Sequence, residues 1–299
     1  MNRWIETQKR QTERLMTLLD IAAKAGYTLV EPPYFIDYDR FREHSSDANA
    51  QAWIKMSNPE GRVLVLRPDL TTSVMEKLSD LSGDTPLKVC YHASVFKQEN
   101  LRLEGTKEFG FEYFNAPQKT GEAAVLELLH SVMHALKLTV IIEWSHAGWL
   151  RRLGEASGLS AGEFQTLKRG LEMKDQERLN AWVDTLPHTE PYRALFHEIT
   201  TLQGPASAVL QRIQTLTSDE SLWADIASLM TLIPATQQWI LDCTLISEHE
   251  YYEGLLFKAY RAQDASAFLR GGRYAVAAQA LTAVGFAFTM TALEEDYDV

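Results

Sequence analysis

The sequence has few of the features that mark specialised classes of protein. Its 299 residues include only 2 cysteines, Cys90 and Cys243, which are too few for a disulfide scaffold and lack the spacing of a metal site. Because both lie in apolar segments, we expect small buried thiols. No stretch approaches the ~18 consecutive apolar residues of a membrane span, and the charged N-terminal segment lacks the apolar region of a secretory signal. These absences favour a soluble cytoplasmic protein.

Positive charge is also scarce. Lys and Arg total 29 against 40 Asp and Glu, for a formal net charge of -11. Such a surface disfavours non-specific binding to nucleic acid and to anionic membranes, although a local basic patch could still be present. With 45% hydrophobic and 23% charged residues, the composition is that of a packed globular protein.

The common catalytic motifs are absent as well. There is no Gly-x-Gly-x-x-Gly fingerprint, no Walker loop and no Gly-x-Ser-x-Gly elbow. Glu127, His130 and His134 would share one face of a helix and could hold a metal ion. Because no second group of ligands accompanies them, we interpret them as ordinary helix residues. We therefore predict neither a metal nor a cofactor.

Helix and strand patterns alternate along the first and last parts of the chain. Apolar spacing predicts helices over residues 2–25, 71–81 and 122–138, the second of them capped by Asp69, Thr71 or Thr72. Alternating or β-branched segments predict strands at 62–70, 87–99, 107–116, 139–145, 239–246, 251–261 and 266–272. We expect a longish hairpin loop before residue 107, and a final helix over the alanine-rich segment 273–284.

Between about residues 148 and 235 the pattern changes. Many leucines, few β-branched runs, and breaks at Gly158, Pro187 and Gly204 indicate a helical module. Neither flanking part looks like a complete sheet alone. We therefore predict an α+β protein with a discontinuous core, residues 1–147 and 236–299, and a helical insertion over 148–235. The sheet of the core should be mostly antiparallel and flanked by helices.

Three segments combine polar side chains with glycine or aromatic residues. The first places Asp69 and two threonines just after a strand, where they could also simply cap a helix. In the second, alternation puts Glu108, Gly110 and Glu112 on one face of a strand. A face of carboxylates suits an ammonium ligand, and a solvated face is the alternative. The third, residues 250–278, has paired tyrosines and a diglycine that lets a ligand approach the backbone.

The order of these motifs is informative. Along the chain come RPDLTT, VFKQE with GFE downstream, YYEGLLFKAY, RGGRY and VGFAFTMTAL. This order resembles that of histidyl-tRNA synthetase and its relatives among the class II aminoacyl-tRNA synthetases. The resemblance covers essentially the whole chain and implies a class II synthetase-like core with a helical insertion.

The resemblance also implies a pocket that binds histidine. Its residues would be Asp69, Thr71, Glu108, Glu112, Tyr251, Tyr252, Gly271, Gly272 and Tyr274. Asp69 and Thr71 would hold the α-amino group, assisted by Glu112. The paired tyrosines would border the imidazole, and the diglycine with Tyr274 would form the opposing wall. The alternative is that these residues only preserve the packing of the sheet.

Several positions depart from the synthetase pattern. Lys97, Ser247 and Ala292 stand where the family carries arginines that act on ATP or in catalysis. Losing guanidinium groups from a triphosphate site removes charge stabilisation, which argues against aminoacylation. Asp69 and Glu108 replace the usual glutamate and glutamine. The chain stops just after the last core motif, so we expect no anticodon-binding domain.

A synthetase-like core with these departures is similar to the regulatory subunits of ATP phosphoribosyltransferase. The resemblance implies a subunit without catalysis of its own. A short-form catalytic subunit would require it in the first step of histidine biosynthesis, which joins ATP and phosphoribosyl pyrophosphate. It would mediate histidine feedback as an allosteric coupling. We expect a homodimer, formed through the first helix and a nearby strand, within a hetero-oligomer, with no nucleic acid and no membrane as partners. The alternatives are a stand-alone, ATP-dependent amino-acid-activating paralogue and a scaffold without histidine sensing.

Overall fold

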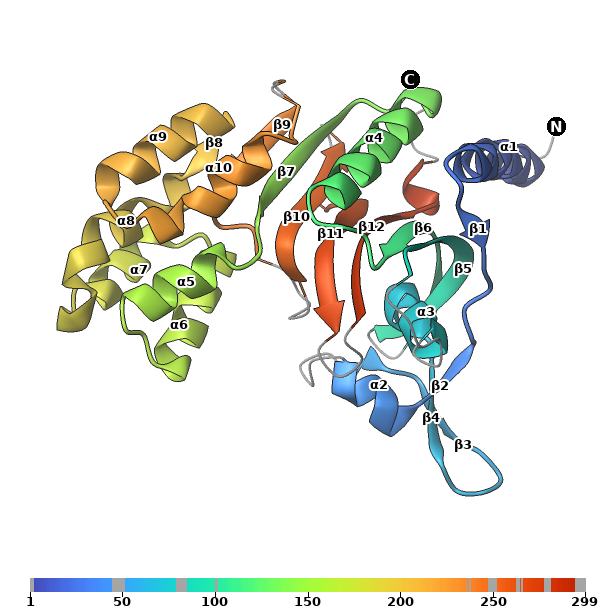
Figure 1. Cartoon of the computed structure of the whole chain (residues 1–299). Helices are drawn as coiled ribbons and strands as arrows, with labels where there is room; N and C mark the ends of the chain where they lie inside the picture. The colour runs from blue at the N-terminus through green and yellow to red at the C-terminus, as the bar shows by residue number, and fades with distance from the viewer. Residues whose placement is uncertain are drawn as a thin grey trace. The chain divides into compact units, whose positions relative to one another are not determined.

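The computed structural model describes residues 3–44, 52–78, 85–99, 102–234, 236, 238–246, 252–261, 264, 266–276 and 281–293. They form two compact units (Figure 1). The first unit contains the described residues within 1–139 and 266–293, and the second contains those within 140–248 and 252–265.

The first unit begins with a long amphipathic helix, α1 (Arg3–Lys24). Leu18 and Ala22 lie buried on its apolar face. The helix ends before Gly26, whose backbone φ of 79° is one that residues other than glycine rarely adopt. The Tyr27 N–H then donates to the Ala22 carbonyl at 2.8 Å, which satisfies one of the last carbonyls of the helix. Neither this helix nor any other in the described chain is long and apolar enough to cross a membrane.

Five strands of the first unit lie side by side. In spatial order they are β1 (Thr28–Leu29), β5 (Leu87–Glu99), β6 (Arg102–Phe114), β12 (Leu281–Thr289) and β11 (Leu269–Val276). The β5–β6, β6–β12 and β12–β11 ladders are antiparallel, and the short edge strand β1 runs parallel to β5. The predictions of an α+β fold and of a mostly antiparallel sheet are confirmed.

Two predictions about local structure were wrong. The expected hairpin loop before residue 107 is strand, because β5 and β6 stay paired up to the register pair Glu99 and Arg102. Of the expected final helix over 273–284, the described residues 273–276 and 281–284 are strand, and Val276 at the end of β11 pairs with Leu281 at the start of β12. Alanine favours helix locally, but cross-strand hydrogen bonding and the buried Arg273 side chain hold this segment in the sheet.

The two faces of these strands differ in character. Strand register places four phenylalanines on one face, with ring centroids 5.0 Å apart for Phe109 and Phe111 and 6.4 Å apart for Phe286 and Phe288. Helix α4 (Thr120–Ala135) packs on β12 and against α1. Helix α3 (Leu70–Leu78) packs on β5 and brings its first turn to the other, polar face. The candidate site therefore lies on the polar face.

A smaller sheet precedes α3. It contains β2 (Phe35–Asp37), β4 (Val63–Leu66) and β3 (Lys55–Ser57) in that spatial order, and α2 (Tyr38–His44) packs beside it. Their shared core consists of Ile36, Phe41, Trp53 and Val65. This core anchors the strand that leads directly into α3, so it fixes where the first turn of that helix lies.

The second unit combines strands with short helices (Figure 1). Its strands, in spatial order, are β10 (Tyr252–Arg261), β7 (Val140–His146), β9 (Trp239–Asp242) and β8 (Gln203–Gly204). Its helices are α5 (Trp149–Ala156), α6 (Ala161–Glu172), α7 (Gln176–Val183), α8 (Arg193–Glu198), α9 (Ala206–Leu216) and α10 (Ala224–Met230), with 3₁₀ turns at Pro187–Tyr192, Ile199–Thr201 and Glu220–Leu222. The helices fall within the range predicted to be helical, and the domain boundaries at 148 and 235 stay predictions.

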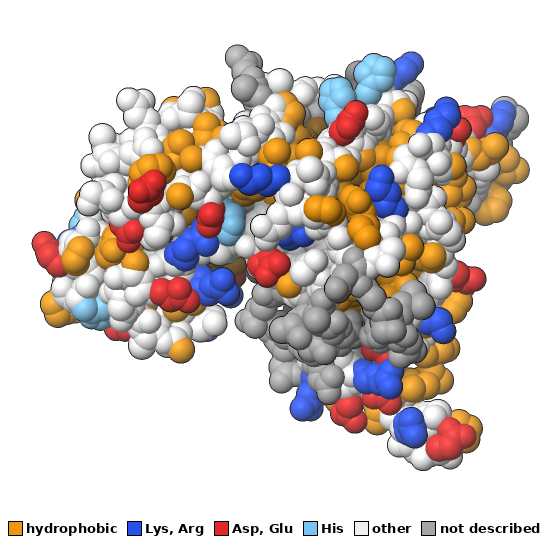
Figure 2. All heavy atoms as spheres, in the orientation of Figure 1, with side chains coloured by type: hydrophobic (Ala, Val, Ile, Leu, Met, Phe, Trp, Pro, Cys, Tyr) orange, Lys and Arg blue, Asp and Glu red, His pale blue; other side chains and the backbone are white. Residues whose placement is uncertain are grey.

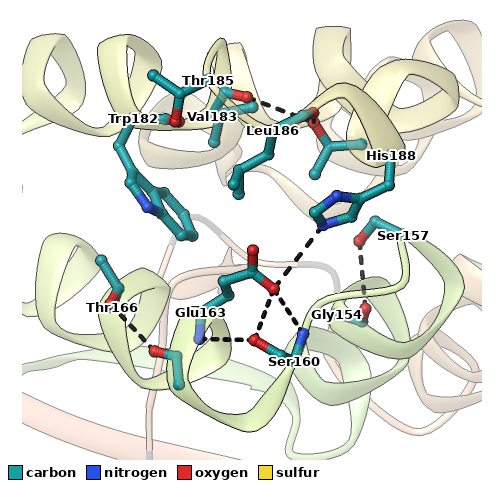
Figure 3. A network of polar contacts seen from close by, with 12 residues as sticks. Gly154, Ser157, Ser160, Glu163, Thr166, Trp182, Val183, Thr185, Leu186 and His188 are labelled. Carbon is teal, nitrogen blue, oxygen red and sulfur yellow. Dashed lines mark hydrogen bonds and ion pairs between the residues drawn. The ribbon is translucent and has the colours of Figure 1, made fainter.

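A capping box fixes the start of α6 (Figure 3). The Ser160 N–H donates to Glu163 Oε2 at 2.7 Å, and the Glu163 N–H donates to Ser160 Oγ at 3.4 Å. The same carboxylate lies 3.8 Å from Nε2 of His188, in the 3₁₀ turn above it. The Glu163 side chain thus both caps α6 and contacts the 3₁₀ turn that contains His188.

Both cysteines are buried and free, as predicted. Burial raises the pKa of the Cys90 thiol to about 11. Burial also raises the pKa of Cys243, and the neighbouring Asp242 carboxylate adds to this effect.

Candidate functional site

A buried carboxylate, Glu112, is the centre of the polar face of the first unit. Its side chain is only 2% exposed. Thr71 Oγ1 donates to Oε1 at 2.8 Å, Tyr91 Oη donates to the same oxygen at 3.2 Å, and Tyr274 Oη donates to Oε2 at 2.8 Å. The hydroxyls of Thr71 and Tyr91 are 3.0 Å apart. Helix α3 and strands β5, β6 and β11 therefore converge on one acidic group.

Two glycines provide the space for this arrangement. Gly110 is paired with Tyr91 across β5 and β6, and a Cβ on it would stand 2.3 Å from Cζ of the tyrosine ring. Gly285 is paired with Glu112 across β6 and β12, and a Cβ there would stand 2.0 Å from Oε2 of the carboxylate. Both side chains can lie flat over the neighbouring strand only because these positions lack a side chain.

Two further carboxyl groups, Asp69 and Glu108, belong to this face. Asp69 caps α3 by accepting from the Thr72 N–H at 2.6 Å, and its charge raises the pKa values of both Glu108 and Glu112. Burial is the larger cause, and the pKa of each glutamate reaches about 7. The hydroxyl donors lower the pKa of Glu112, and Lys97 lowers that of Glu108.

This arrangement is suited to a cation that carries hydrogen-bond donors. Buried carboxylates with raised pKa values gain most from an incoming positive charge, because it offsets both their desolvation and their mutual repulsion. A primary ammonium group has three donors and could be shared among such acceptors. The chemistry of the face therefore favours an ammonium ligand over a phosphate or another anion.

A buried ion pair supports the strand that forms one wall of the site. Arg273 on β11 and Glu122 on α4 are both almost fully buried, and Nη2 of the arginine donates to Oε2 of the glutamate at 2.9 Å. The same guanidinium donates to the carbonyls of Ala116 at 3.2 Å and Pro117 at 3.3 Å. Because its neighbour Tyr274 points to the opposite face, this pair fixes the height at which the tyrosine meets Glu112.

The arginine of the RPDLTT motif holds the segment before α3 in place. Arg67 is buried, and its Nε donates to the Ser94 carbonyl at 2.6 Å while Nη1 donates to the Pro32 carbonyl at 2.7 Å. Its guanidinium also lies 4.1 Å above the centre of the Tyr34 ring. These contacts use two of its five N–H donors and tie the segment that begins α3 to β5 and to the Pro32 backbone.

The structure brings together most of the residues that the sequence singles out. Asp69, Thr71, Glu108, Glu112 and Tyr274 meet at the polar face as described above. Gly272 is paired with Gly285 and so shares that face, whereas its neighbour Gly271 belongs to the opposite one. Tyr252 begins β10 in the second unit.

Other predicted positions are less informative. Tyr251 and Ser247 lie outside the described residues. Ala292 lies in a short 3₁₀ helix, Thr291–Leu293, after β12. Lys97 is exposed on β5 and is paired with Glu104.

Three contributors to the site were missed from the sequence. Tyr91, Gly285 and the Arg273–Glu122 pair depend on which strands are neighbours and in which register. Tyr91 could have been found from the alternation within β5 once its pairing with Gly110 is known. Arg273 and Gly285 lie in the RGGRY and VGFAFTMTAL motifs, but their roles depend on Glu122 and Glu112, which are distant in sequence.

The possible metal ligands on α4 do not form a site. Glu127, His130 and His134 are all exposed on the helix surface. Within the part of the chain that the structure describes, no group of three or more His, Cys, Asp or Glu side chains is placed to hold a metal ion.

Comparisons with known proteins point to one family. The histidyl-tRNA synthetase family model matches residues 4–293. The ATP phosphoribosyltransferase regulatory subunit of Oceanobacillus iheyensis is 26% identical over 281 residues, which cover 90% of this chain and 69% of that protein. A Listeria monocytogenes protein of the same name is 28% identical, and the match covers 84% of this chain and 65% of the relative. The chain thus spans about two thirds of the length of these relatives.

Solved structures share the fold. A Bacillus halodurans protein described as an ATP phosphoribosyltransferase regulatory subunit/histidyl-tRNA synthetase gives a TM-score of 0.83 at 20% identity, covering 99% of this chain and 80% of that one. A chain of the HisG:HisZ ATP phosphoribosyl transferase complex from Thermotoga maritima gives a TM-score of 0.69 at 19% identity, covering 94% and 97%.

Proposed function

Because the chain belongs to the histidyl-tRNA synthetase family, we propose that it is a regulatory subunit of ATP phosphoribosyltransferase. The observation that carries this proposal is the match along 90% of the chain to the Oceanobacillus protein of that name. In this role the chain makes no bond itself. It binds a short-form catalytic subunit, which joins ATP and phosphoribosyl pyrophosphate, and it changes the activity of that subunit. The use of ATP favours a cytoplasmic complex.

We further propose that the polar face around Glu112 is the histidine site. Three features support this assignment: Glu108, Glu112 and Asp69 supply negative charge, the hydroxyls of Thr71, Tyr91 and Tyr274 orient the central carboxylate, and the residues are buried enough for charge to matter. The α-ammonium of histidine would contact the carboxylates. Feedback then requires that histidine bind the inhibited and active arrangements of the complex with different affinities.

A homodimer is the third part of the proposal. Large apolar side chains are exposed on α1 and β1, including Trp4 at 68%, Met16 at 66% and Leu29 at 53%. Figure 2 shows hydrophobic side chains along the edge of the first unit that carries these elements. Exposed apolar area of this kind is typical of a surface that is covered in the assembled protein. A second copy of the chain would cover it.

The experiment that tests the regulatory function is co-purification with a short-form catalytic subunit from the same organism. A stable hetero-oligomer in size-exclusion chromatography with light scattering is the expected result. Two proteins that elute separately at all concentrations would refute the proposal. Met16→Glu should convert the isolated dimer to a monomer, whereas Met173→Glu should not, since Met173 is similarly exposed but belongs to the second unit and to neither α1 nor β1.

The rival function, a synthetase-like enzyme that activates an amino acid, predicts a different result. It would exchange labelled pyrophosphate into ATP in the presence of histidine. We expect no exchange above background, because Lys97 offers one point charge where the family uses the bidentate guanidinium group of an arginine. Exchange proportional to enzyme concentration would favour the enzyme.

A further inference from the structure

A cavity lies in the first unit, on the face of the sheet opposite Glu112. Its volume is about 650 Å³, within the range of small-molecule sites. Its walls come from α1, from β1 and the segment after it, and from β5 and β6, and its apolar lining includes Leu15, Leu19, Leu29 and Phe96. We propose that this cavity binds a small organic anion, a carboxylate or a phosphate ester, with an apolar or aromatic body.

Strand register places three polar side chains of the cavity next to one another. Ser94 on β5 is paired with Lys107 on β6, so the two side chains project from the same face. His92, two residues before Ser94, shares that face and stacks on Phe109, with ring centroids 6.2 Å apart. Because side chains alternate along β6, this face is the one opposite Glu112. Burial, together with the Lys107 charge, lowers the pKa of His92, so its imidazole is neutral at pH 7.

Arg67 joins two walls of the cavity and keeps unused donors. It bonds the carbonyls of Ser94, in β5, and of Pro32, in the segment after β1, and its guanidinium lies against the Tyr34 ring. Within the described chain the guanidinium forms no other hydrogen bond, so Nη2 has no partner. Nη2 is not among the described nitrogens that are both unpartnered and closed to solvent, so solvent reaches it although the residue is 2% exposed.

The other polar groups of the lining are also unpaired. Among the described residues, no hydrogen bond or ion pair is formed by the side chains of Glu31, His92, Ser94 and Lys107. Two cations, Arg67 and Lys107, and one carboxylate, Glu31, line the cavity, so its lining carries excess positive charge in a chain whose net charge is -11. The Ser94 hydroxyl and the neutral imidazole can add hydrogen bonds. These groups favour an anion, since hydrogen bonds from a guanidinium or an ammonium to a charged oxygen are the strong ones.

The cavity also adjoins the proposed dimer surface, because Leu29 belongs to both. A second copy of the chain is therefore the rival occupant. The inference does not depend on the regulatory function or on the histidine site, since the cavity and the Glu112 carboxylate lie on opposite faces of the sheet.

The test is a calorimetric titration of the full chain with phenyl phosphate, with phenylacetate and with the neutral benzyl alcohol. We expect at least one of the two acids to bind at least about tenfold more tightly than benzyl alcohol, because its oxygens receive charge-assisted hydrogen bonds. Tighter binding of phenyl phosphate would identify a phosphate ligand, and tighter binding of phenylacetate a carboxylate. Equal binding of all three probes, or no binding of either acid up to millimolar concentration, would overturn the proposal.

Variants of two exposed, unpaired side chains locate the bound acid. Lys107→Gln should weaken its binding about threefold and Glu31→Gln should tighten it about twofold, because they remove lining charges of opposite sign. Both should keep the thermal midpoint of the wild type, since neither change removes a hydrogen bond of the fold. Lys77→Gln is the matched control, because Lys77 is exposed on α3 and outside the cavity.

Two results with the variants would contradict the assignment. Unchanged affinity in both Lys107→Gln and Glu31→Gln would place the bound acid elsewhere on the chain. Binding of the acids by a monomeric Met16→Glu variant but not by the wild-type dimer would show that a second copy fills the cavity.

Discussion

Replacing Glu112 by glutamine should make the protein more stable at alkaline pH while removing the ligand site. Burial and Asp69 raise the pKa of this carboxyl from 4.5 to about 7, in spite of three hydroxyl donors. As pH rises, the unfolded chain therefore loses this proton before the folded chain does. The free energy of unfolding consequently decreases between pH 4.5 and pH 7.

The size of this effect follows from the pKa shift. At 1.36 kcal/mol for each tenfold change in proton affinity, a rise of the pKa from 4.5 to about 7 lowers the free energy of unfolding by about 3 kcal/mol once the group is ionised in both states. Glu112→Gln keeps the shape and one acceptor but cannot ionise. The difference in unfolding free energy between variant and wild type should therefore grow by about 2–3 kcal/mol, in favour of the variant, from pH 5 to pH 8.

Urea unfolding of the full chain at both pH values measures this difference. Glu127→Gln is the matched control, because Glu127 is exposed on α4 and should give the same small difference at both pH values. The reasoning would be refuted if Glu112→Gln tracked the wild type at both pH values, or if it lost more stability at pH 8 than at pH 5. Histidine binding to Glu112→Gln, followed by calorimetry, should weaken strongly, because the central carboxylate can no longer carry charge while Asp69 and Glu108 remain.

Further predictions concern packing and reactivity. Gly285→Ala should destabilise the protein by about 2–3 kcal/mol or prevent folding, because its Cβ would meet the Glu112 carboxylate and a backbone carbonyl, whereas Gly162→Ala, with nothing within 4 Å in α6, should stabilise it slightly in thermal melts. Arg273→Met alone should cost about 3–5 kcal/mol by leaving a buried charge, and adding Glu122→Leu should recover part of that loss in a double-mutant cycle. Cys90 should react with a thiol reagent only after denaturant is added, since burial raises its pKa to about 11, and rapid labelling of the native chain would contradict this.

Local patterns in the sequence were sufficient for many, but not all, of the regular elements of the fold. The amphipathic spacing of residues 2–25 predicted α1, and the alternation around Glu108 and Glu112 predicted the polar and aromatic faces of β6. The alanine-rich segment from Arg273 to Val284 was misread because helix propensity is a weak preference. Here the partner strand supplies hydrogen bonds, and Glu122, distant in sequence, supplies an ion pair.

Only part of the candidate site could be predicted from the sequence. Asp69, Thr71, Glu108, Glu112 and Tyr274 lie in motifs whose resemblance to a known family is visible in the sequence alone. The space that holds them together depends on strand register. The role of Gly285 follows only from its pairing with Glu112 on the neighbouring strand, where any side chain would meet the carboxylate.

The most direct test of the regulatory role is the rate at which a short-form catalytic subunit joins ATP and phosphoribosyl pyrophosphate, measured with and without this chain across a histidine titration. If the chain is the regulatory subunit, adding it should raise the rate of product formation, and histidine should then lower that rate. With Glu112→Gln in its place, activation should persist and the inhibition by histidine should be lost. A rate that is the same with and without the chain would contradict the account.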